Sequence, residues 1–324
     1  MNKNLEIVLY IQNIYGLNQI ENPYNPIDSF LLDNYGSLYN EIGNYLNHKK
    51  IDRIYYGSEF CDELIPSISD VKKILKTVTI HNLQFSLVTP CVSNSGIKRL
   101  EKILLFLNEF HNIEIICNDF GVLQLIRDKY TNLIPVLGRL IDKTSREPRI
   151  KQNERKLFFN QNGIKFISSP NVYTKEYQNI LKDYNVNRVE FDCVPQGIHL
   201  QKKNTSTSIY FPFYYITTGS ICPFRLISAD KNDIYNINHT CKKYCQLYNV
   251  KLKKSDLVLL QKGNTIYKDI SDINTFINHL AFVDRIIIQY FVSVKSNVGA
   301  VSKSPWSQSK VSSTIEKKGN LVVF

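Results

Sequence analysis

Three consecutive pieces of the chain decide its fold class: IDRIYYG (51–57), SISDVKKILKTVTIHN (67–82) and LQFSLVTP (83–90). The first and last are short and rich in apolar, β-branched and aromatic residues, a composition typical of strands. The middle piece predicts a helix, with Ser67 or Ser69 as its N-cap. A strand, a helix and a second strand in this order predict a parallel pair of strands joined by a crossover helix.

The same alternation extends in both directions. Further strands are predicted at LEIVLYI (5–11), IEIICND (113–119), NLIPVLGRLI (132–141), KFISSP (165–170), NRVEFDCV (187–194) and SIYFPFYYITT (208–218). Further helices are predicted at 28–48, 96–110, 120–130 and 174–185. Six or more such units favour an α/β fold that closes into a TIM-barrel-like (β/α) barrel, with a doubly wound open sheet as the alternative. The first strand is followed by no G-x-G-x-x-G pattern, which argues against a dinucleotide enzyme.

The chain divides by pattern into three parts. Residues 1–250 are expected to form the barrel-like domain, with a cysteine-rich cluster-binding segment near its end. Residues 251–294 predict a small C-terminal α+β extension that completes or extends the barrel, beginning with a hairpin about Lys262-Gly263-Asn264. Residues 295–324 are polar, lack apolar periodicity and are expected to form a tail.

The bulk composition limits the cellular setting. The chain has 324 residues and a formal net charge of +11, from 40 Lys and Arg against 29 Asp and Glu. This charge favours a polyanion such as RNA as a partner, but the lysines are scattered, so nucleic acid is the less favoured interpretation. No apolar run approaches the ~20 residues that a membrane helix needs, and no secretory signal pattern is present. We therefore expect a cytoplasmic protein without a membrane span.

Polar side chains follow several predicted strands at the point where each strand ends. Asp119 follows IEIIC, Arg139 follows LIPVLG, and Glu190 lies near the end of NRVEFD. Because active sites of such barrels lie at the carboxyl ends of the strands, these residues are candidate catalytic groups.

Strand 187–194 has one charged and one apolar face. Arg188, Glu190 and Asp192 alternate with Val189, Phe191 and Cys193, so the charged set should point into the barrel. Charges in such a place need partners. Arg139 and Arg149 are the expected partners, and Arg149 is therefore also a candidate catalytic residue, although a purely structural ion pair is an equal alternative.

Cysteines give the sharpest chemical signal. Cys241 and Cys245 are spaced C-x3-C, so on a helix both sulfurs would lie on one face. Cys222 precedes this pair, and Cys61 could return from another strand end. Four thiolates are the usual ligand set of a [4Fe–4S] or [2Fe–2S] cluster. Zinc is the alternative, although its sites usually carry two tight Cys pairs.

The other three cysteines, Cys91, Cys117 and Cys193, are expected to be ordinary buried residues. No Cys–His or Ser–His–Asp arrangement is evident in the sequence. The sequence therefore gives no positive sign of a nucleophile with an activating base.

Several segments together resemble the collagenase-like peptidase family (peptidase family U32). They are CNDFGVLQL, LGRLID with the later EPR, NRVEFDCVPQGI, and IYFPFYYITTGSIC followed by C-x3-C. The resemblance runs from about residue 5 to residue 250 and is closest to the short, UbiU/UbiV-like iron–sulfur members. It implies a barrel-like core and a [4Fe–4S] cluster on four cysteines, one early and three later. Cys61, Cys222, Cys241 and Cys245 fall in those places, although Asp62 and Glu63 follow Cys61 where relatives usually carry a basic residue.

The resemblance implies a redox enzyme, or a redox subunit, in the oxygen-independent hydroxylation or related modification of a small or aromatic substrate. It also implies a heterodimer with a second family member. Two alternatives stay open: a collagenase-like peptidase and a tRNA-modifying, RNA-binding protein.

Overall fold

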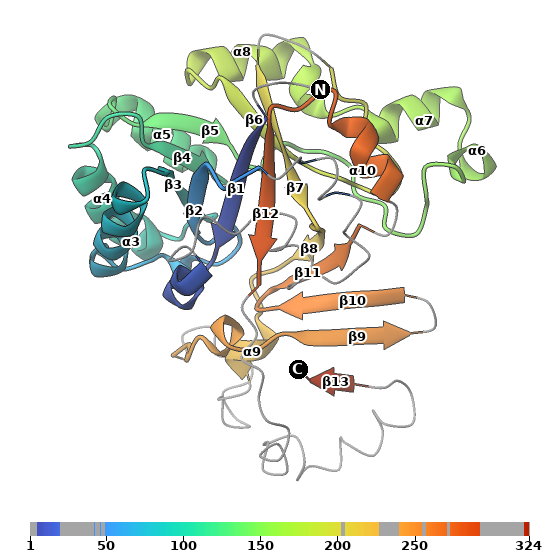
Figure 1. The fold of residues 1–324 in the computed structure, drawn as a ribbon. Coiled ribbons are helices and arrows are strands. Elements are labelled where there is room, and N and C mark those ends of the chain that lie inside the picture. The colour runs from blue at the N-terminus through green and yellow to red at the C-terminus, as the bar shows by residue number, and fades with distance from the viewer. Residues whose placement is uncertain are drawn as a thin grey trace. The chain divides into compact units, whose positions relative to one another are not determined.

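A computed structural model describes residues 5–19, 42, 46, 49–201, 205–226, 240–254, 257–270, 273–291 and 321–323 (Figure 1). The described residues belong to two compact units. The first unit comprises residues 1–214 and 270–290, and the second comprises residues 215–269 and 291–324. This division cuts across the three expected parts, because the chain leaves the first unit after residue 214 and returns to it at residue 270.

The first unit contains a closed barrel of parallel strands in the order β1-β12-β7-β6-β5-β4-β3-β2. The strands are β1 (Glu6–Ile11), β2 (Arg53–Gly57), β3 (Gln84–Thr89), β4 (Glu114–Cys117), β5 (Ile134–Leu137), β6 (Arg188–Asp192), β7 (Ser206–Phe211) and β12 (Arg285–Tyr290). Strand β1 pairs in parallel with both β2 and β12, which closes the ring. The predicted TIM-barrel-like α/β fold is therefore confirmed, and the open doubly wound sheet is wrong.

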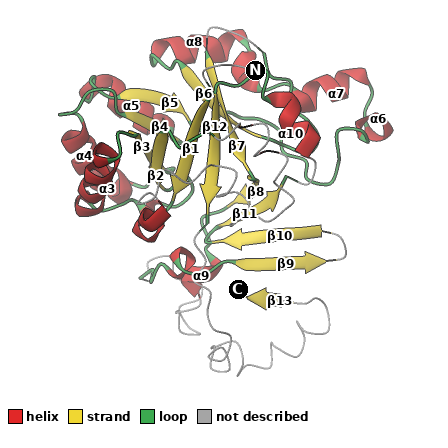
Figure 2. Cartoon of the chain, viewed as in Figure 1, coloured by secondary structure: helices red, strands yellow, loops and turns green. Residues whose placement is uncertain are grey.

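Helices lie around the outside of the strand ring (Figure 2). They are α3 (Ile68–Ile80), α4 (Asn94–Leu107), α5 (Phe120–Lys129), α6 (Arg155–Phe158), α7 (Gln161–Ser168), α8 (Lys175–Asp183) and α10 (Ile273–His279). Ser67 caps α3 by accepting a hydrogen bond from the Asp70 N–H, and Ser93 caps α4 in the same way through Gly96. The predicted helix at 28–48 lies outside the described residues, apart from Ile42 and Leu46.

The spacing of apolar residues explains why α4 forms and where it packs. Leu100, Ile103, Leu104 and Leu107 recur every three or four residues and are all buried. Burial of one such side chain stabilises the fold by about 1.5–3 kcal/mol relative to exposure. The apolar residues that recur at helical spacing thus form the buried face of α4.

One predicted strand is a helix. KFISSP (165–170) overlaps α7, which begins after Asn160, whose side chain accepts a hydrogen bond from the Gly163 N–H. Ile and Phe favour strands locally, but the adjacent Ile167 and Ser168 are both buried while Phe166 is 77% exposed, a pattern that fits a helical face and breaks strict alternation. The N-cap and this periodicity outweigh the strand propensity.

The predicted strand at 208–218 is interrupted at Pro212. Strand β7 ends at Phe211, and β8 (Phe213–Thr218) begins immediately after the proline. Proline has no backbone N–H and cannot continue a strand ladder, so the chain changes sheets at this point.

The second unit is built on a sheet in the order β13-β9-β10-β11-β8. Its further strands are β9 (Val250–Lys254), β10 (Leu257–Lys262), β11 (Thr265–Asp269) and β13 (Leu321–Val323). Lys262 pairs with Thr265 across Gly263, whose φ of 60° suits the turn, so the predicted hairpin is confirmed. In the expected tail, residues 295–320 and 324 lie outside the described residues, and β13 pairs with β9.

The amino-terminal end of the barrel is closed by partly buried ion pairs. Arg53 bonds to Glu6 at 2.6 Å, and Arg285 bonds to both Glu6 and Glu114 at 2.6 Å. Burial opposes ionisation of Glu114, but Arg285 and Arg53 outweigh it and lower its pKa to about 2. Since active sites of such barrels lie at the opposite end, this layer has a structural role.

Candidate functional site

The carboxyl-terminal end of the barrel is organised by Asn118, which follows β4. Its side chain donates to the Thr89 carbonyl and accepts from the Leu140 N–H, both at 3.0 Å. Gly138 makes this possible, because a Cβ atom there would lie 2.4 Å from the Asn118 Oδ1. Asn118 therefore links the ends of β3, β4 and β5 and places Arg139.

Arg139 is the centre of a fully buried ion network. Its Nε and Nη2 donate to Glu59 at 2.8 and 2.7 Å, and its Nη1 donates to Asp192 at 2.6 Å. The guanidinium also lies 3.6 Å from the centroid of the Tyr210 ring. Burial opposes the charge of Arg139, but Asp192 and Glu59 outweigh it and raise its pKa above the usual value.

Arg146 extends the network from the loop that follows Arg139. It donates to Asp192 at 3.1 Å and to the Arg139 carbonyl at 2.9 Å, and it lies 3.5 Å from Asp142. Burial raises the pKa of Asp142 to about 6, although Arg146 and Thr144 lower it. The network joins the carboxyl groups of Glu59, Asp142 and Asp192 to only two guanidinium groups, and this excess of carboxyl groups favours the protonated form of one of them.

Glu190 lies in the barrel interior, as the parity of its strand predicted. Its carboxylate accepts hydrogen bonds from Tyr55 at 2.8 Å and Tyr210 at 2.6 Å. Burial raises the pKa of Glu190 to about 7, although the two tyrosine hydrogen bonds lower it. Tyr10 packs edge-on against both tyrosine rings. This carboxyl can change protonation near neutral pH without leaving its place.

The structure brings together some predicted site residues and separates others. Arg139 and Glu190 both contact Tyr210. Asp119 instead caps α5 by accepting from the Gly121 and Val122 N–H groups. Arg149 pairs with Glu147, and its side chain is 82% exposed. Its expected pairing with the charges of β6 is wrong, because Arg146 occupies that place.

Sequence reasoning did not single out Glu59 or Arg146. Arg53, Tyr55 and Glu59 share the same parity, so extending the inward face of β2 two residues beyond Gly57 could have indicated Glu59. Arg146 lies in an irregular loop, and no periodic signal marks it.

The cysteines fall in both units. Cys61 belongs to the first unit, where it precedes η3 (Asp62–Leu64). Asp62, at the position where the resemblance led us to expect a basic residue, accepts a hydrogen bond from the Ser93 N–H at 3.2 Å. The acidic residue therefore anchors the Cys61 segment to the start of α4.

Cys222, Cys241 and Cys245 belong to the second unit. Burial raises the pKa of Cys222, and the Arg225 and Phe224 backbone N–H groups lower it. Cys241 is close enough to raise the same pKa further. The Cys241 sulfur accepts from the Lys243 N–H, with an N···S distance of 3.4 Å.

Cys241 and Cys245 do not share a helix. Lys243 has a φ of 56°, in the left-handed region, and the 3₁₀ turn η6 (Tyr244–Gln246) begins only after it. The prediction of one helical face was therefore wrong. Among the residues that the structure describes, no three His, Cys, Asp or Glu side chains are close enough together to hold a metal ion.

The remaining cysteines differ from one another. Cys117 and Cys193 are buried, as predicted. Cys91 is exposed rather than buried, and its thiol donates to Asp119 at 3.3 Å. Cys91 lies two residues beyond the end of β3.

Comparisons with family models, curated proteins and solved structures found no match. Within the described part of the chain, no helix is long and apolar enough to cross a membrane.

Proposed function

We propose that this chain is an iron–sulfur protein of the redox type, with Cys222, Cys241 and Cys245 among the ligands of a [4Fe–4S] cluster. The observation that carries the proposal is the proximity of Cys241 to Cys222. These cysteines are separated by 18 intervening residues, Cys241 lies close enough to raise the pKa of Cys222, and both sulfurs lie near backbone N–H donors. Such N–H donors stabilise thiolates and tune the potential of clusters.

The bound cluster would supply one-electron transfer. The resemblance extends the proposal to oxygen-independent hydroxylation of a small or aromatic substrate, and to a heterodimer with a second family member. In the barrel, Glu190 is a buried group whose raised pKa of about 7 lets it hold or release a proton near neutral pH. Arg139 is a positioning residue, because Glu59, Asp192 and the Phe213 carbonyl occupy its donors.

The test is the iron, acid-labile sulfide and zinc content of protein purified without oxygen. We expect about four iron and four sulfide per chain. The content should fall in Cys222→Ala, Cys241→Ala and Cys245→Ala, and Cys61→Ala reports whether Cys61 is the fourth ligand. Cys91→Ala is the matched control and should keep the full content. Zinc in place of iron, or iron that survives all four substitutions, would overturn the proposal.

A thiol peptidase is not favoured by the surroundings of Cys91. An active thiol needs a lowered pKa and a base in reach. Partial burial of the sulfur and the Asp119 carboxylate raise the pKa of Cys91 instead. Its place beside Asp119 therefore disfavours the thiolate.

The distribution of charge favours a second candidate function, RNA binding. The second unit carries 14 Lys and Arg against 5 Asp and Glu, whereas the first carries 26 against 24. Lys251 and Lys253 are exposed and share one face of β9. Nearly all of the net positive charge is thus concentrated in the smaller unit, as is typical of polyanion-binding surfaces.

The salt dependence of transfer-RNA binding tests this candidate. We expect the logarithm of the binding constant to fall steeply with the logarithm of salt concentration. The double variant Lys251→Gln/Lys253→Gln should reduce that slope. Lys73→Gln/Lys76→Gln removes two exposed lysines from α3 and serves as the control. An equal effect of both pairs, or no binding at low salt, would exclude a specific surface on β9.

A further inference from the structure

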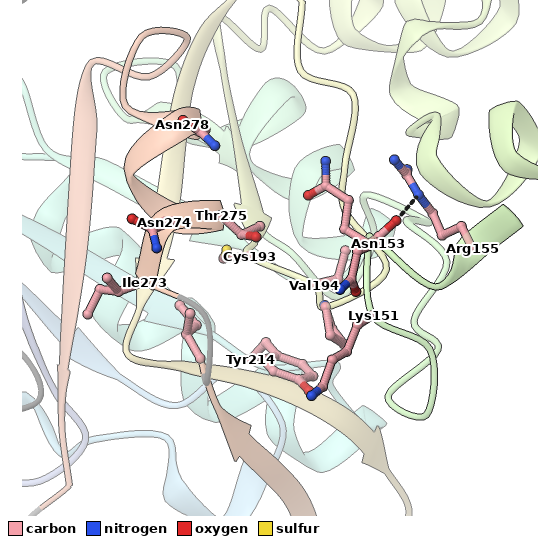
Figure 3. Close-up of a pocket in the computed structure, with 13 residues that line it drawn as sticks. Lys151, Asn153, Arg155, Cys193, Val194, Tyr214, Ile273, Asn274, Thr275 and Asn278 are labelled. Carbon is pink, nitrogen blue, oxygen red and sulfur yellow. Dashed lines mark hydrogen bonds between the residues drawn. The ribbon is translucent and has the colours of Figure 1, made fainter.

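A groove of about 820 Å³ in the first unit has no part in the proposed redox chemistry (Figure 3). It lies beyond the carboxyl end of β6, and its buried lining includes Cys193, Val194 and Tyr214. This volume is within the range of sites for small molecules. Its position at the carboxyl edge of a (β/α) barrel is where such sites usually occur.

One wall of the groove is cationic. Lys151 and Arg155 line it, and no Asp or Glu is among the described lining residues. Arg155 donates through Nε to the Gln152 carbonyl at 3.1 Å, and no acidic side chain of the described residues pairs with it. Partial burial lowers the pKa of Arg155. The closest acidic neighbour in sequence, Glu154, accepts from the backbone N–H of Lys151 rather than lining the groove. Two cationic side chains therefore line the groove, with no acidic side chain among its described lining residues.

The opposite wall is neutral and polar. Asn274 and Asn278 are one helical turn apart on α10 and face the groove from the side opposite Lys151 and Arg155 (Figure 3). His279 holds this helix in place through contacts with the Thr275 carbonyl at 2.5 Å and the Ile198 carbonyl at 3.2 Å. Carboxamides both donate and accept hydrogen bonds, so this wall can bind hydroxyl groups or the edge of a heterocycle.

The lining between the two walls is mainly apolar. Ile270 and Ile273 join the Tyr214 ring there. An aromatic ring beside aliphatic groups suits a flat organic body. The groove thus combines a cationic wall, a carboxamide wall and an apolar lining.

We propose that this groove binds a phosphate monoester of about the size of a nucleoside monophosphate. Lys151 and Arg155 would contact the phosphate, whose charge of about −1.5 to −2 at neutral pH matches their two positive charges. A carboxylate would balance only one of them. The carboxamides of α10 would bind the polar edge of the body, and Tyr214 with Ile273 would contact its flat face.

This site is independent of the cysteine proposal. All of its lining residues belong to the first unit, whereas Cys241 belongs to the second. Cys241→Ala should therefore lose any cluster but keep phosphate-ester binding. The two proposals can fail separately.

Calorimetric titration with adenosine 5′-monophosphate and with adenosine tests the site on the full chain. We expect the monophosphate to bind at least about tenfold more tightly than the nucleoside, because charged hydrogen bonds contribute that much. Lys151→Gln and Arg155→Gln should each weaken monophosphate binding about tenfold, while Arg155→Lys should retain most of it.

Lys156→Gln is the matched control, since Lys156 is an exposed lysine of the same segment outside the groove. Thermal unfolding of each variant checks that the fold is kept. Equal affinity for nucleoside and monophosphate, no binding of the monophosphate at millimolar concentration, or an equal loss in Lys156→Gln would each overturn the proposal.

Discussion

Arg139 donates two parallel hydrogen bonds to Glu59, at 2.8 and 2.7 Å, and both side chains are completely buried. This bidentate geometry joins the segment after β2 to the segment after β5, on separate strands of the barrel. A rigid ion pair of this kind fixes the positions of neighbouring groups. Removal of either member of the pair should be costly, because the other member would keep a buried charge that has lost its partner.

Glu59→Ala should destabilise the protein by about 3–5 kcal/mol, since it leaves the Arg139 guanidinium without its bidentate partner. Urea unfolding followed by circular dichroism measures the change. Glu147→Ala is the control: it breaks the exposed pair with Arg149 and should change stability by less than about 1 kcal/mol. Similar losses in the two variants would contradict the role assigned to the buried pair.

Glu190 should make the stability of the protein depend on pH between its unfolded and folded pKa values. The folded pKa is about 7, above the ordinary value of 4.5, so the folded state keeps a proton that the unfolded state releases. This contribution is present below pH 4.5 and is lost as pH rises towards 7. Unfolding free energies from pH 4.5 to 7.5 should therefore fall less steeply for Glu190→Gln than for the wild type. Parallel curves would show that Glu190 titrates normally.

Asp119→Ala should cost about 1 kcal/mol, because it removes the N-cap of α5. The variant should also lower the pKa of Cys91, which loses the neighbouring carboxylate that raises it. Thermal unfolding and the pH dependence of Cys91 alkylation report the two effects. Asp128→Ala, at the far end of the same helix, should leave both unchanged or slightly raise stability. If Asp119→Ala removed activity without either effect, Asp119 would be catalytic rather than structural.

Gly138→Ala should destabilise the barrel by about 1–3 kcal/mol, since the added methyl group would lie 2.4 Å from Asn118 and displace its hydrogen bonds. Gly219→Ala is the control, because a Cβ atom there meets nothing within 4 Å. Chemical denaturation compares the two. A neutral Gly138→Ala would show that Asn118 can move at little cost, and that its links to β3 and β5 are not needed.

The order of strands and helices could be predicted because the spacing of apolar residues differs between the two kinds of element. Strands such as β6 alternate between an inward charged face and an outward apolar face, and that parity placed Glu190 in the interior. The strand predicted at 165–170 was wrong because its strand-forming residues form an isolated run. The residue that decides for a helix, the N-cap Asn160, lies before that run. Propensity is the weaker determinant where a cap and a helical face agree.

The candidate site was less predictable than the fold. Asn118 and Gly138 act as a pair, and their close approach depends on the register of β4 against β5, which one sequence does not specify. The same applies to Glu59, whose partner is 80 residues away. For the cysteines, the spacing C-x3-C suggested a helix. The left-handed backbone conformation of Lys243 prevents that helix, and the spacing of the cysteines does not predict this conformation.

The position of β12 in the chain has a consequence for synthesis on the ribosome. Glu6 of β1 pairs with Arg285 of β12, a partner that is made 279 residues later. Until then a nascent chain carries β1 and β7 as two open strand edges, and it has already produced residues 215–269. Exposed edges of this kind promote aggregation. We therefore expect truncation before residue 285 to yield insoluble chains, and cells to need chaperones while this protein is being translated.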